Sequence, residues 1–231
     1  MFGIFGQSKK VTGIDIKSDC IRFLELDNTN GTDRITAYGE VTFDGVEPND
    51  ATLIQYFRDI KKNLRSKVIN VAIPVGSDEK KCFELLKSAG FKPAKIISPA
   101  KPLELSLVPE NADTSFLIVD TEKSETNYLI FAPNIDPKFY TSDPANHSII
   151  SNLNRLYIDW YDRHKERVHH VLVCGSRAAD QDFLDYVSRE TKIPITQANI
   201  FTNLKLDQSN VPIINKKDSY KYAVALGLAI S

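Results

Sequence analysis

Apolar residues recur along this chain with two periods, and the two periods alternate in the same order in each half. Short β-branched runs and strict apolar–polar alternation, as in residues 21–26, predict strands. Longer stretches with apolar residues at helical spacing, as in residues 51–64, predict amphipathic helices. Strands are expected over residues 11–16, 21–26, 35–43, 68–74, 95–97, 116–120, 128–131, 138–141, 168–173 and 192–195. Helices are expected over residues 51–64, 78–89, 148–164, 179–191 and 219–230.

Turn and cap residues lie between these elements. Residues 28–31 (NTNG) read as a hairpin turn, and residues 134–137 turn the chain at the matching place in the second half. Asp50 is placed to cap the first helix at its N-terminus, and Gly90 to close the second at its C-terminus. Each half therefore reads as two or three strands in a meander, followed by helix, strand, helix and strand.

This order predicts an α/β protein of two duplicated ββ(β)αβαβ lobes, each a mixed sheet flanked by helices. We expect a leader over residues 1–10, a first lobe over 11–110 and a second lobe over 111–231. The small residues of the helix over 219–230 suit close packing against a sheet, and this helix could pack back on the first lobe.

Composition excludes several classes of protein. The chain has 231 residues, of which 42% are hydrophobic and 26% charged, as in ordinary globular proteins. A net charge of -1 gives no general attraction to nucleic acid. No apolar stretch approaches the roughly 18 to 20 residues that span a bilayer, and no secretory signal is recognised. The leader, with Phe2, Ile4 and Phe5 before two lysines, could touch a membrane or partner, or simply be a frayed or sheet-tucked terminus.

Cysteine and histidine give no sign of a metal centre. Three cysteines are widely spaced without a C-x-x-C pair, as expected of reduced thiols in a cytosolic protein. Four histidines include no i,i+4 pair, and His169 and His170 should point to opposite faces of a strand. We expect no metal site.

The candidate chemistry lies at two turns. Asp15 and Asp120 each end a β-branched run, and a tight turn of small residues would follow if phosphate were to be bound there. The turns instead carry Lys17 and Glu122, and Glu122 brings negative charge where a polyphosphate would sit. The sequence therefore predicts a nucleotide-binding scaffold whose phosphate-binding turns are altered. Lys17 is either a point charge for a phosphate or an exposed turn lysine with no such role.

In serial order the motifs resemble the PilM family, the actin-like component of type IV pilus assembly. This family is related to FtsA and lies within the actin, Hsp70 and sugar-kinase superfamily, with its ribonuclease H-like lobes. The resemblance covers nearly the whole chain, although each motif is short. The matching stretches are residues 1–6, 13–16, 21–22, 24–26, 85–93, 171–176 and 222–229.

Against this family the chain departs in two ways. The family places a small subdomain after the strand that matches residues 68–74, whereas here Val75-Gly76-Ser77 leads directly into the next helix. In the family this subdomain helps to form the groove for the cytoplasmic tail of the membrane protein PilN.

The second departure is the erosion of the nucleotide motifs. The nucleotide-contacting positions implied by the resemblance are Asp15, Lys17, Ser18, Asp120, Thr126, Gly175 and Ser176. Lys17 replaces a glycine of the first phosphate turn and Glu122 one of the second. Gly175-Ser176 stands for the Gly-Gly pair under the adenosine. Asp15 and Asp120 could hold Mg²⁺ through water, or only cap their turns.

The resemblance implies a cytoplasmic adaptor of a type IV pilus or related secretion platform, peripheral at the inner membrane. It would bind the cytoplasmic tail of a PilN-like protein, and would bind neither nucleic acid nor, with any strength, Mg-ATP. No catalytic residue is expected. The main alternative is an active Mg-ATP-dependent ATPase or kinase of the superfamily that uses Asp15 and Asp120, and a filament-forming actin-like protein is a third hypothesis.

Overall fold

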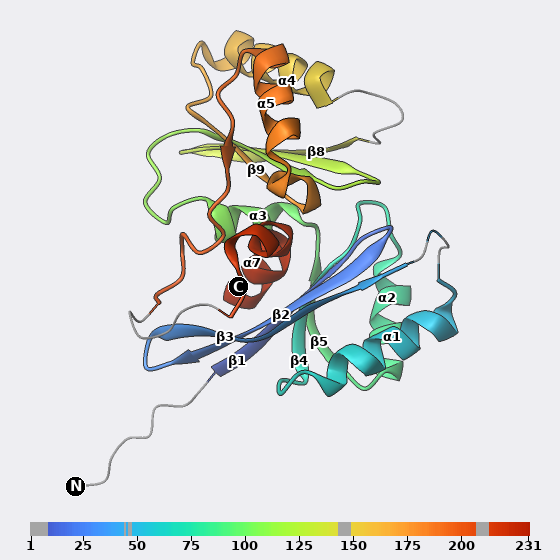
Figure 1. The fold of residues 1–231 in the computed structure, drawn as a ribbon. Coiled ribbons are helices and arrows are strands. Elements are labelled where there is room, and N and C mark those ends of the chain that lie inside the picture. The colour runs from blue at the N-terminus through green and yellow to red at the C-terminus, as the bar shows by residue number, and fades with distance from the viewer. Residues whose placement is uncertain (1–8, 44, 46–47, 143–148, 207–212) are drawn as a thin grey trace, which may run out of the picture. The chain divides into compact units, whose positions relative to one another are not determined.

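The structure, a computed structural model, describes residues 9–43, 45, 48–142, 149–206 and 213–231. The chain forms two compact units (Figure 1). Unit 1 comprises Met1–Ser106, Asn203–Asn215 and Val224–Ser231, and unit 2 comprises Leu107–Thr202 and Lys216–Ala223. The single boundary expected after residue 110 did not foresee the return of residues 203–215 to unit 1. Apart from Lys9 and Lys10, the expected leader lies outside the described residues.

Unit 1 contains a five-stranded mixed sheet in the order β3-β2-β1-β4-β5. The first three strands form an antiparallel meander, and β4 and β5 run parallel to β1. In chain order the elements are β1 (Lys9–Ile16), β2 (Cys20–Thr29), β3 (Thr32–Thr42), α1 (Asp50–Lys62), β4 (Val68–Ala72), α2 (Glu79–Ser88), β5 (Lys92–Ile97) and α3 (Ala100–Leu107).

Unit 2 repeats this topology with the order β10-β9-β6-β7-β8. Its elements are β6 (Phe116–Thr121), β7 (Thr126–Ala132), β8 (Ile135–Ser142), α4 (Ile149–His164), β9 (His170–Cys174), the 3-10 turn η1 (Ser176–Ala179), α5 (Gln181–Thr191), β10 (Thr196–Gln197), α6 (Lys216–Ser219) and η2 (Tyr220–Tyr222). The last helix, α7 (Ala223–Ile230), lies almost wholly in unit 1. Two mixed sheets flanked by helices confirm the predicted fold class.

Several local predictions were wrong. Asn49, not Asp50, caps α1, because its side chain accepts a hydrogen bond from the Thr52 amide at 3.0 Å. The last strand is β10, one residue beyond the expected 192–195. The helix expected over 219–230 is divided into α6, η2 and α7, and the helix expected from 179 begins at Gln181, after η1. The helix α3 was not foreseen at all.

The sheet of unit 1 is covered on both faces. Apolar residues of α1 and α2, such as Phe57 and Leu86, pack with Ile14 and Val71 of the sheet in one cluster. Helix α7 packs on the opposite face, where a Cβ on Gly13 would overlap the backbone carbonyl of Ala225. Figure 1 shows α1 and α2 on one side of this sheet and α7 on the other. Gly13 and Ile14 are on opposite faces of β1, so Gly13 lies against α7 and Ile14 packs with the apolar residues of α1 and α2.

The C-terminus is held to the same sheet by a buried amide. The Asn70 side chain in β4 donates hydrogen bonds to the Leu228 carbonyl at 2.9 Å and to Ser231 Oγ at 3.1 Å.

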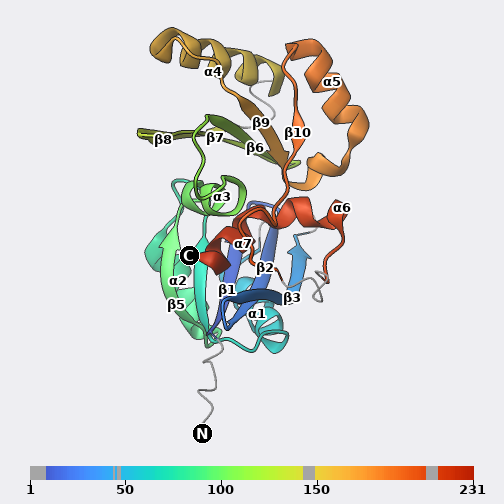
Figure 2. The same ribbon diagram turned by 90° about the vertical axis from the view of Figure 1, so that its left-hand side faces the viewer.

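In unit 2, α4 and α5 lie on one side of the sheet (Figure 2), with Trp160, Phe183 and Val187 in the core.

A buried carboxylate joins three parts of unit 1. Glu25 in β2 is 1% exposed, and its Oε2 accepts hydrogen bonds from the Arg65 amide at 2.8 Å and the Ser66 amide at 2.7 Å. Its Oε1 accepts a third from the Thr36 hydroxyl at 2.7 Å. These bonds tie the segment between α1 and β4 to the meander, so that the start of β4 is fixed by a side chain of β2.

We expect Glu25→Ala to lower the free energy of unfolding by about 2–4 kcal/mol, because the Arg65 and Ser66 amides and the Thr36 hydroxyl lose a charged acceptor. Glu25→Gln, which keeps one acceptor oxygen, should cost less. Denaturant unfolding followed by circular dichroism measures both, with Glu84→Ala on the exposed face of α2 as the matched control. A Glu25→Ala protein as stable as that control would contradict this role.

Candidate functional site

The two aspartates expected at a nucleotide site lie at equivalent places in the two sheets. Asp15 pairs across the hairpin with Arg22, and Asp120 with Asn127. In each hairpin one further pair of residues follows before the turn opens. Residues 17 and 122 therefore occupy the same position in the two halves, the first position of the turn.

The turn backbones are also alike. The Lys17 amide donates to the Cys20 carbonyl at 2.9 Å, and the Glu122 amide donates to the Glu125 carbonyl at 2.9 Å. Both amides are thus used inside their own hairpins. A phosphate that approached either turn would meet a long side chain at the position where close approach needs a glycine.

In unit 1 the candidate residues form a buried ion pair. Lys17 Nζ lies 3.6 Å from Asp15 Oδ2, and the two side chains are 2% and 1% exposed. The alternative that Lys17 is an exposed turn lysine is therefore wrong. Ser18, the next residue, is exposed. A lysine that is buried against an aspartate supplies the positive charge that this carboxylate needs in a low-dielectric place.

In unit 2, Asp120 is 2% exposed at the end of β6. Its Oδ2 lies 3.5 Å from the Asn127 amide nitrogen, and the Cys174 thiol lies 3.8 Å from its Oδ1. The Thr126 hydroxyl, expected to face a nucleotide, lies 3.4 Å from the Thr121 hydroxyl. The structure thus places Asp120 and Thr126 at the same hairpin, each beside polar atoms of unit 2.

The turn after β9 requires its glycine. Gly175 has φ +88°, and a Cβ there would lie 2.8 Å from the Thr121 nitrogen and 2.9 Å from Asp120 Oδ1. The Gly175 amide donates to the Tyr220 carbonyl at 3.0 Å. The turn that carries Gly175 and Ser176 is therefore pressed against the end of β6, beside the hairpin of Glu122.

Glu122 takes a position that sequence reasoning did not foresee. It is 2% exposed, and its Oε2 accepts a hydrogen bond from the Ser176 amide at 3.2 Å. The sequence showed a charge that would repel phosphate, but no local signal indicates that this side chain folds inward onto an amide 54 residues further on. The structure thus brings together Asp120, Glu122, Gly175 and Ser176.

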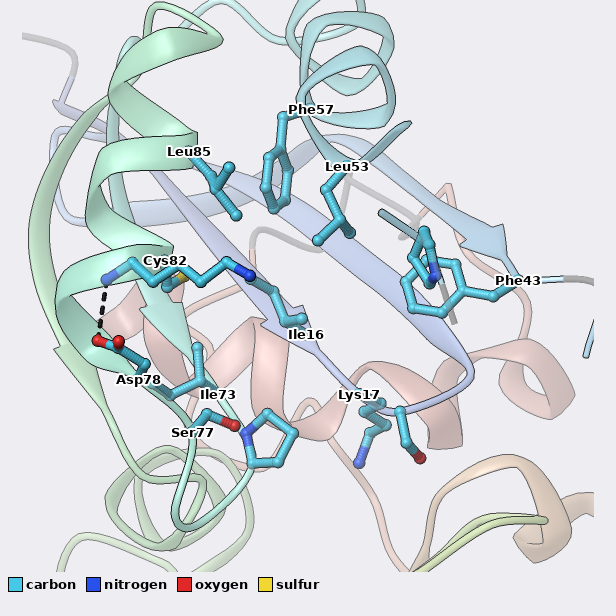
Figure 3. A pocket seen from close by; sticks show the side chains of 14 residues that line it. Ile16, Lys17, Phe43, Leu53, Phe57, Ile73, Ser77, Asp78, Cys82 and Leu85 are labelled. Atoms are coloured by element: carbon cyan, nitrogen blue, oxygen red, sulfur yellow. Dashed lines mark hydrogen bonds between the residues drawn. The ribbon is translucent and has the colours of Figure 1, made fainter. Parts of the chain in front are cut away.

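A separate cavity of about 560 Å³ lies within unit 1, between α1, α2 and the ends of β1 and β4 (Figure 3). In this view Leu53 and Phe57 point into it from α1, and Leu85 from α2. The lining residues are Ile16, Lys17, Ser18, Phe43, Pro48, Leu53, Phe57, Ile73, Pro74, Ser77, Asp78, Lys81, Cys82 and Leu85. Sequence analysis had assigned its helix residues only to the core.

The polar groups of this cavity lie at the end of β1, with Lys17 and Ser18, and at the start of α2, with Ser77, Asp78 and Lys81. Lys81 Nζ lies 2.8 Å from the Asp50 carboxylate, and Asp78 caps α2 by accepting from the Lys81 amide at 3.0 Å. Burial raises the pKa of the Cys82 thiol to about 11, so this cysteine is protonated at neutral pH and behaves as an apolar wall. The cavity is a mainly apolar surface with cations nearby.

The described residues contain no group of three or more histidine, cysteine, aspartate or glutamate side chains that could hold a metal ion. Among them, no helix combines the length and the apolar character that crossing a membrane requires.

Comparison with known proteins gives structural relatives alone. No family model and no curated protein matches the sequence. The structure of a PilM-PilN type IV pilus biogenesis complex matches with TM-score 0.70 at 12% identity, over 95% of this chain and 97% of that one. Ethanolamine utilization protein EutJ from Carboxydothermus hydrogenoformans matches with TM-score 0.63 at 14% identity, over 96% and 89%. MreB5 of Spiroplasma citri bound to ADP matches with TM-score 0.58 at 12% identity, over 96% and 95%.

The chain has the fold of the actin-like ATPases. In this actin-like fold the paired hairpins with Asp15 and Asp120 are the two copies of one duplicated element, as their registers show. At identities of 12–14% these likenesses establish the fold and leave the choice of partner or ligand to the residues themselves.

Proposed function

We propose that this chain is a non-catalytic adaptor with an actin-like fold. It binds the cytoplasmic tail of a PilN-like inner-membrane protein in a type IV pilus or related secretion platform, and reaches the membrane through that partner. The observation that carries the non-catalytic part is the Glu122 carboxylate on the Ser176 amide. The likeness to the PilM-PilN structure, at TM-score 0.70, supports the choice of partner.

The residues present do not fit Mg-ATP. Two structural neighbours are described with ADP or its relatives bound: MreB5, and the activator of a 2-hydroxyisocaproyl-CoA dehydratase with bound ADPNP, at TM-score 0.53. Phosphates of such a ligand are bound by main-chain amides and a cation. Here Glu122 places a carboxylate at the second turn, where it would repel phosphate, and this carboxylate accepts a hydrogen bond from the Ser176 amide. Lys17 is paired with Asp15, the carboxylate that would face a metal.

The energetic consequence is large. Each charge-assisted hydrogen bond to phosphate contributes about 1.5–3 kcal/mol, so the loss of two or three lowers affinity by orders of magnitude. The main alternative, an active ATPase or kinase, relies on Asp15 and Asp120, which are present and buried. The two hypotheses therefore make opposite predictions about nucleotide binding.

The cavity of unit 1 is the surface that we propose for the partner. Its walls are apolar side chains of α1 and α2, including Leu53 and Leu85, and Lys81 lies at its rim. A short peptide with apolar anchors has the chemistry that complements such a surface. Because the strand β4 leads directly through Ser77 into α2, α1 and α2 themselves form these walls.

Isothermal titration calorimetry with Mg-ATP separates the adaptor from the enzyme. We expect no binding tighter than about 10 μM, because the Ser176 amide and the Asp15 carboxylate are already occupied by side chains of this chain. An ATPase assay on the same protein should show no turnover above a buffer control. Tight binding together with turnover would establish the alternative.

Binding of a labelled synthetic peptide, with the sequence of the cytoplasmic tail of the PilN-like protein from the same organism, tests the adaptor directly. We expect a Kd below about 100 μM by fluorescence anisotropy. Leu53→Asp, which places a charge in the cavity, and Ser77→Trp, which fills it from an exposed position, should each weaken binding at least about tenfold.

The control for the peptide experiment is Ile158→Asp. Ile158 is 59% exposed on α4 of unit 2, so this variant introduces the same charge away from the cavity. It should bind the peptide as the unmodified protein does. Absence of binding at 100 μM peptide, or equal loss in Ile158→Asp and Leu53→Asp, would overturn the proposed function.

A further inference from the structure

We propose that the chain supplies its own substitutes for a phosphate and a cation: the Glu122 carboxylate takes the place of an anionic ligand at the Ser176 amide, and the Lys17 ammonium that of a metal ion at Asp15. Each of the two hairpins then has a side chain of the chain itself at the position of a ligand. The inference does not depend on the partner, so a failed peptide experiment would leave it standing.

The substitution in unit 2 rests on a turn that keeps a ligand-binding backbone. Gly175 retains φ +88°, which a side chain would strain, and no Cβ fits between it and the end of β6. The amide that follows, of Ser176, has a carboxylate oxygen 3.2 Å away. A carboxylate resembles a phosphate in charge sign and in its acceptor oxygens, so it satisfies the same donor. In this turn the Glu122 carboxylate is therefore an anion that belongs to the chain itself.

The burial of Glu122 makes this contact consequential. At 2% exposure the carboxylate has exchanged water for protein donors, and the Ser176 amide is the donor from the neighbouring turn. Removal of the side chain leaves the partly exposed Ser176 amide without this acceptor. An inorganic anion that reaches the turn can then accept a hydrogen bond from it.

In unit 1 the side chain that stands in for a ligand is a cation. Asp15 is 1% exposed, and the ammonium of Lys17 lies 3.6 Å from its Oδ2. A buried carboxylate requires a cation or strong donors, and in this hairpin the cation is covalently attached to the chain. The ammonium of Lys17 offsets the negative charge of Asp15, so the pair attracts Mg²⁺ less than the carboxylate alone would.

The duplication supports treating the two substitutions as one device. Lys17 and Glu122 occupy the same turn position in two copies of one hairpin, and each folds inward to a nearly complete burial. Lys17 contacts the Asp15 carboxylate, where a cation would bind, and Glu122 contacts the Ser176 amide, where an anion would bind. The hairpin of unit 1 carries the cation because its partner is a carboxylate, and the hairpin of unit 2 carries the anion because its partner is an amide donor.

Rescue by an external ligand tests the proposal. The full chain and Glu122→Ala are melted at equal ionic strength in sodium chloride or in 10 mM sodium pyrophosphate without metal. Glu122→Ala should melt below the unmodified chain in chloride. Pyrophosphate should then raise its Tm by at least about 2 °C more than that of the unmodified chain. Calorimetry should show pyrophosphate binding at least about tenfold tighter in the variant.

The matched control is Glu125→Ala, which removes a carboxylate from the same turn but leaves Glu122 on the Ser176 amide. It should show no rescue. Lys17→Ala gives the reciprocal test, since 10 mM Mg²⁺ should raise its Tm and leave that of the unmodified chain unchanged. Should Glu122→Ala fail to fold, Glu122→Ser removes the carboxylate and keeps a polar side chain at the turn, and pyrophosphate should stabilise it more than the unmodified chain. Equal effects of pyrophosphate on all variants, or none on any, would overturn the proposal.

Discussion

A carboxylate buried against one backbone amide constrains the chemistry of the second half of this protein. Because Gly175 bends the chain back against the end of β6, the Ser176 amide is held beside the first hairpin turn of unit 2. Glu122, the side chain that begins this turn, folds inward onto it. The amide needs an acceptor, and the chain provides a carboxylate that is itself buried. The adaptor hypothesis builds on this contact, because a carboxylate at this turn would repel a phosphate.

The duplicated fold explains why a second substitution occurs in unit 1. In both units an aspartate lies near the end of the first strand, and a turn follows it. In unit 1 the turn residue is Lys17, and the aspartate is its partner. What remains open in unit 1 is the cavity between α1 and α2, whose apolar walls suit a peptide better than a nucleotide.

Much of the fold could be predicted from the sequence, because the order of alternating and helical patterns repeats in the two halves. Local chemistry was harder. Asp50 and Asn49 are both good caps, and only the structure shows that Asn49 reaches the Thr52 amide. The burial of Lys17 and Glu122 could not be predicted, since a charged turn residue is usually exposed and their partners are set by tertiary packing. The cavity was missed because Leu53 and Leu85 follow the same period whether they fill a core or line a space.

Hydrogen exchange of the Ser176 amide tests the central claim most directly. In the unmodified chain this amide should exchange slowly by NMR, because it donates to a buried carboxylate. In Glu122→Ala it should exchange at least about tenfold faster, while the Gly175 amide, which donates to Tyr220, remains protected. Equal exchange of Ser176 in the two proteins would contradict the account.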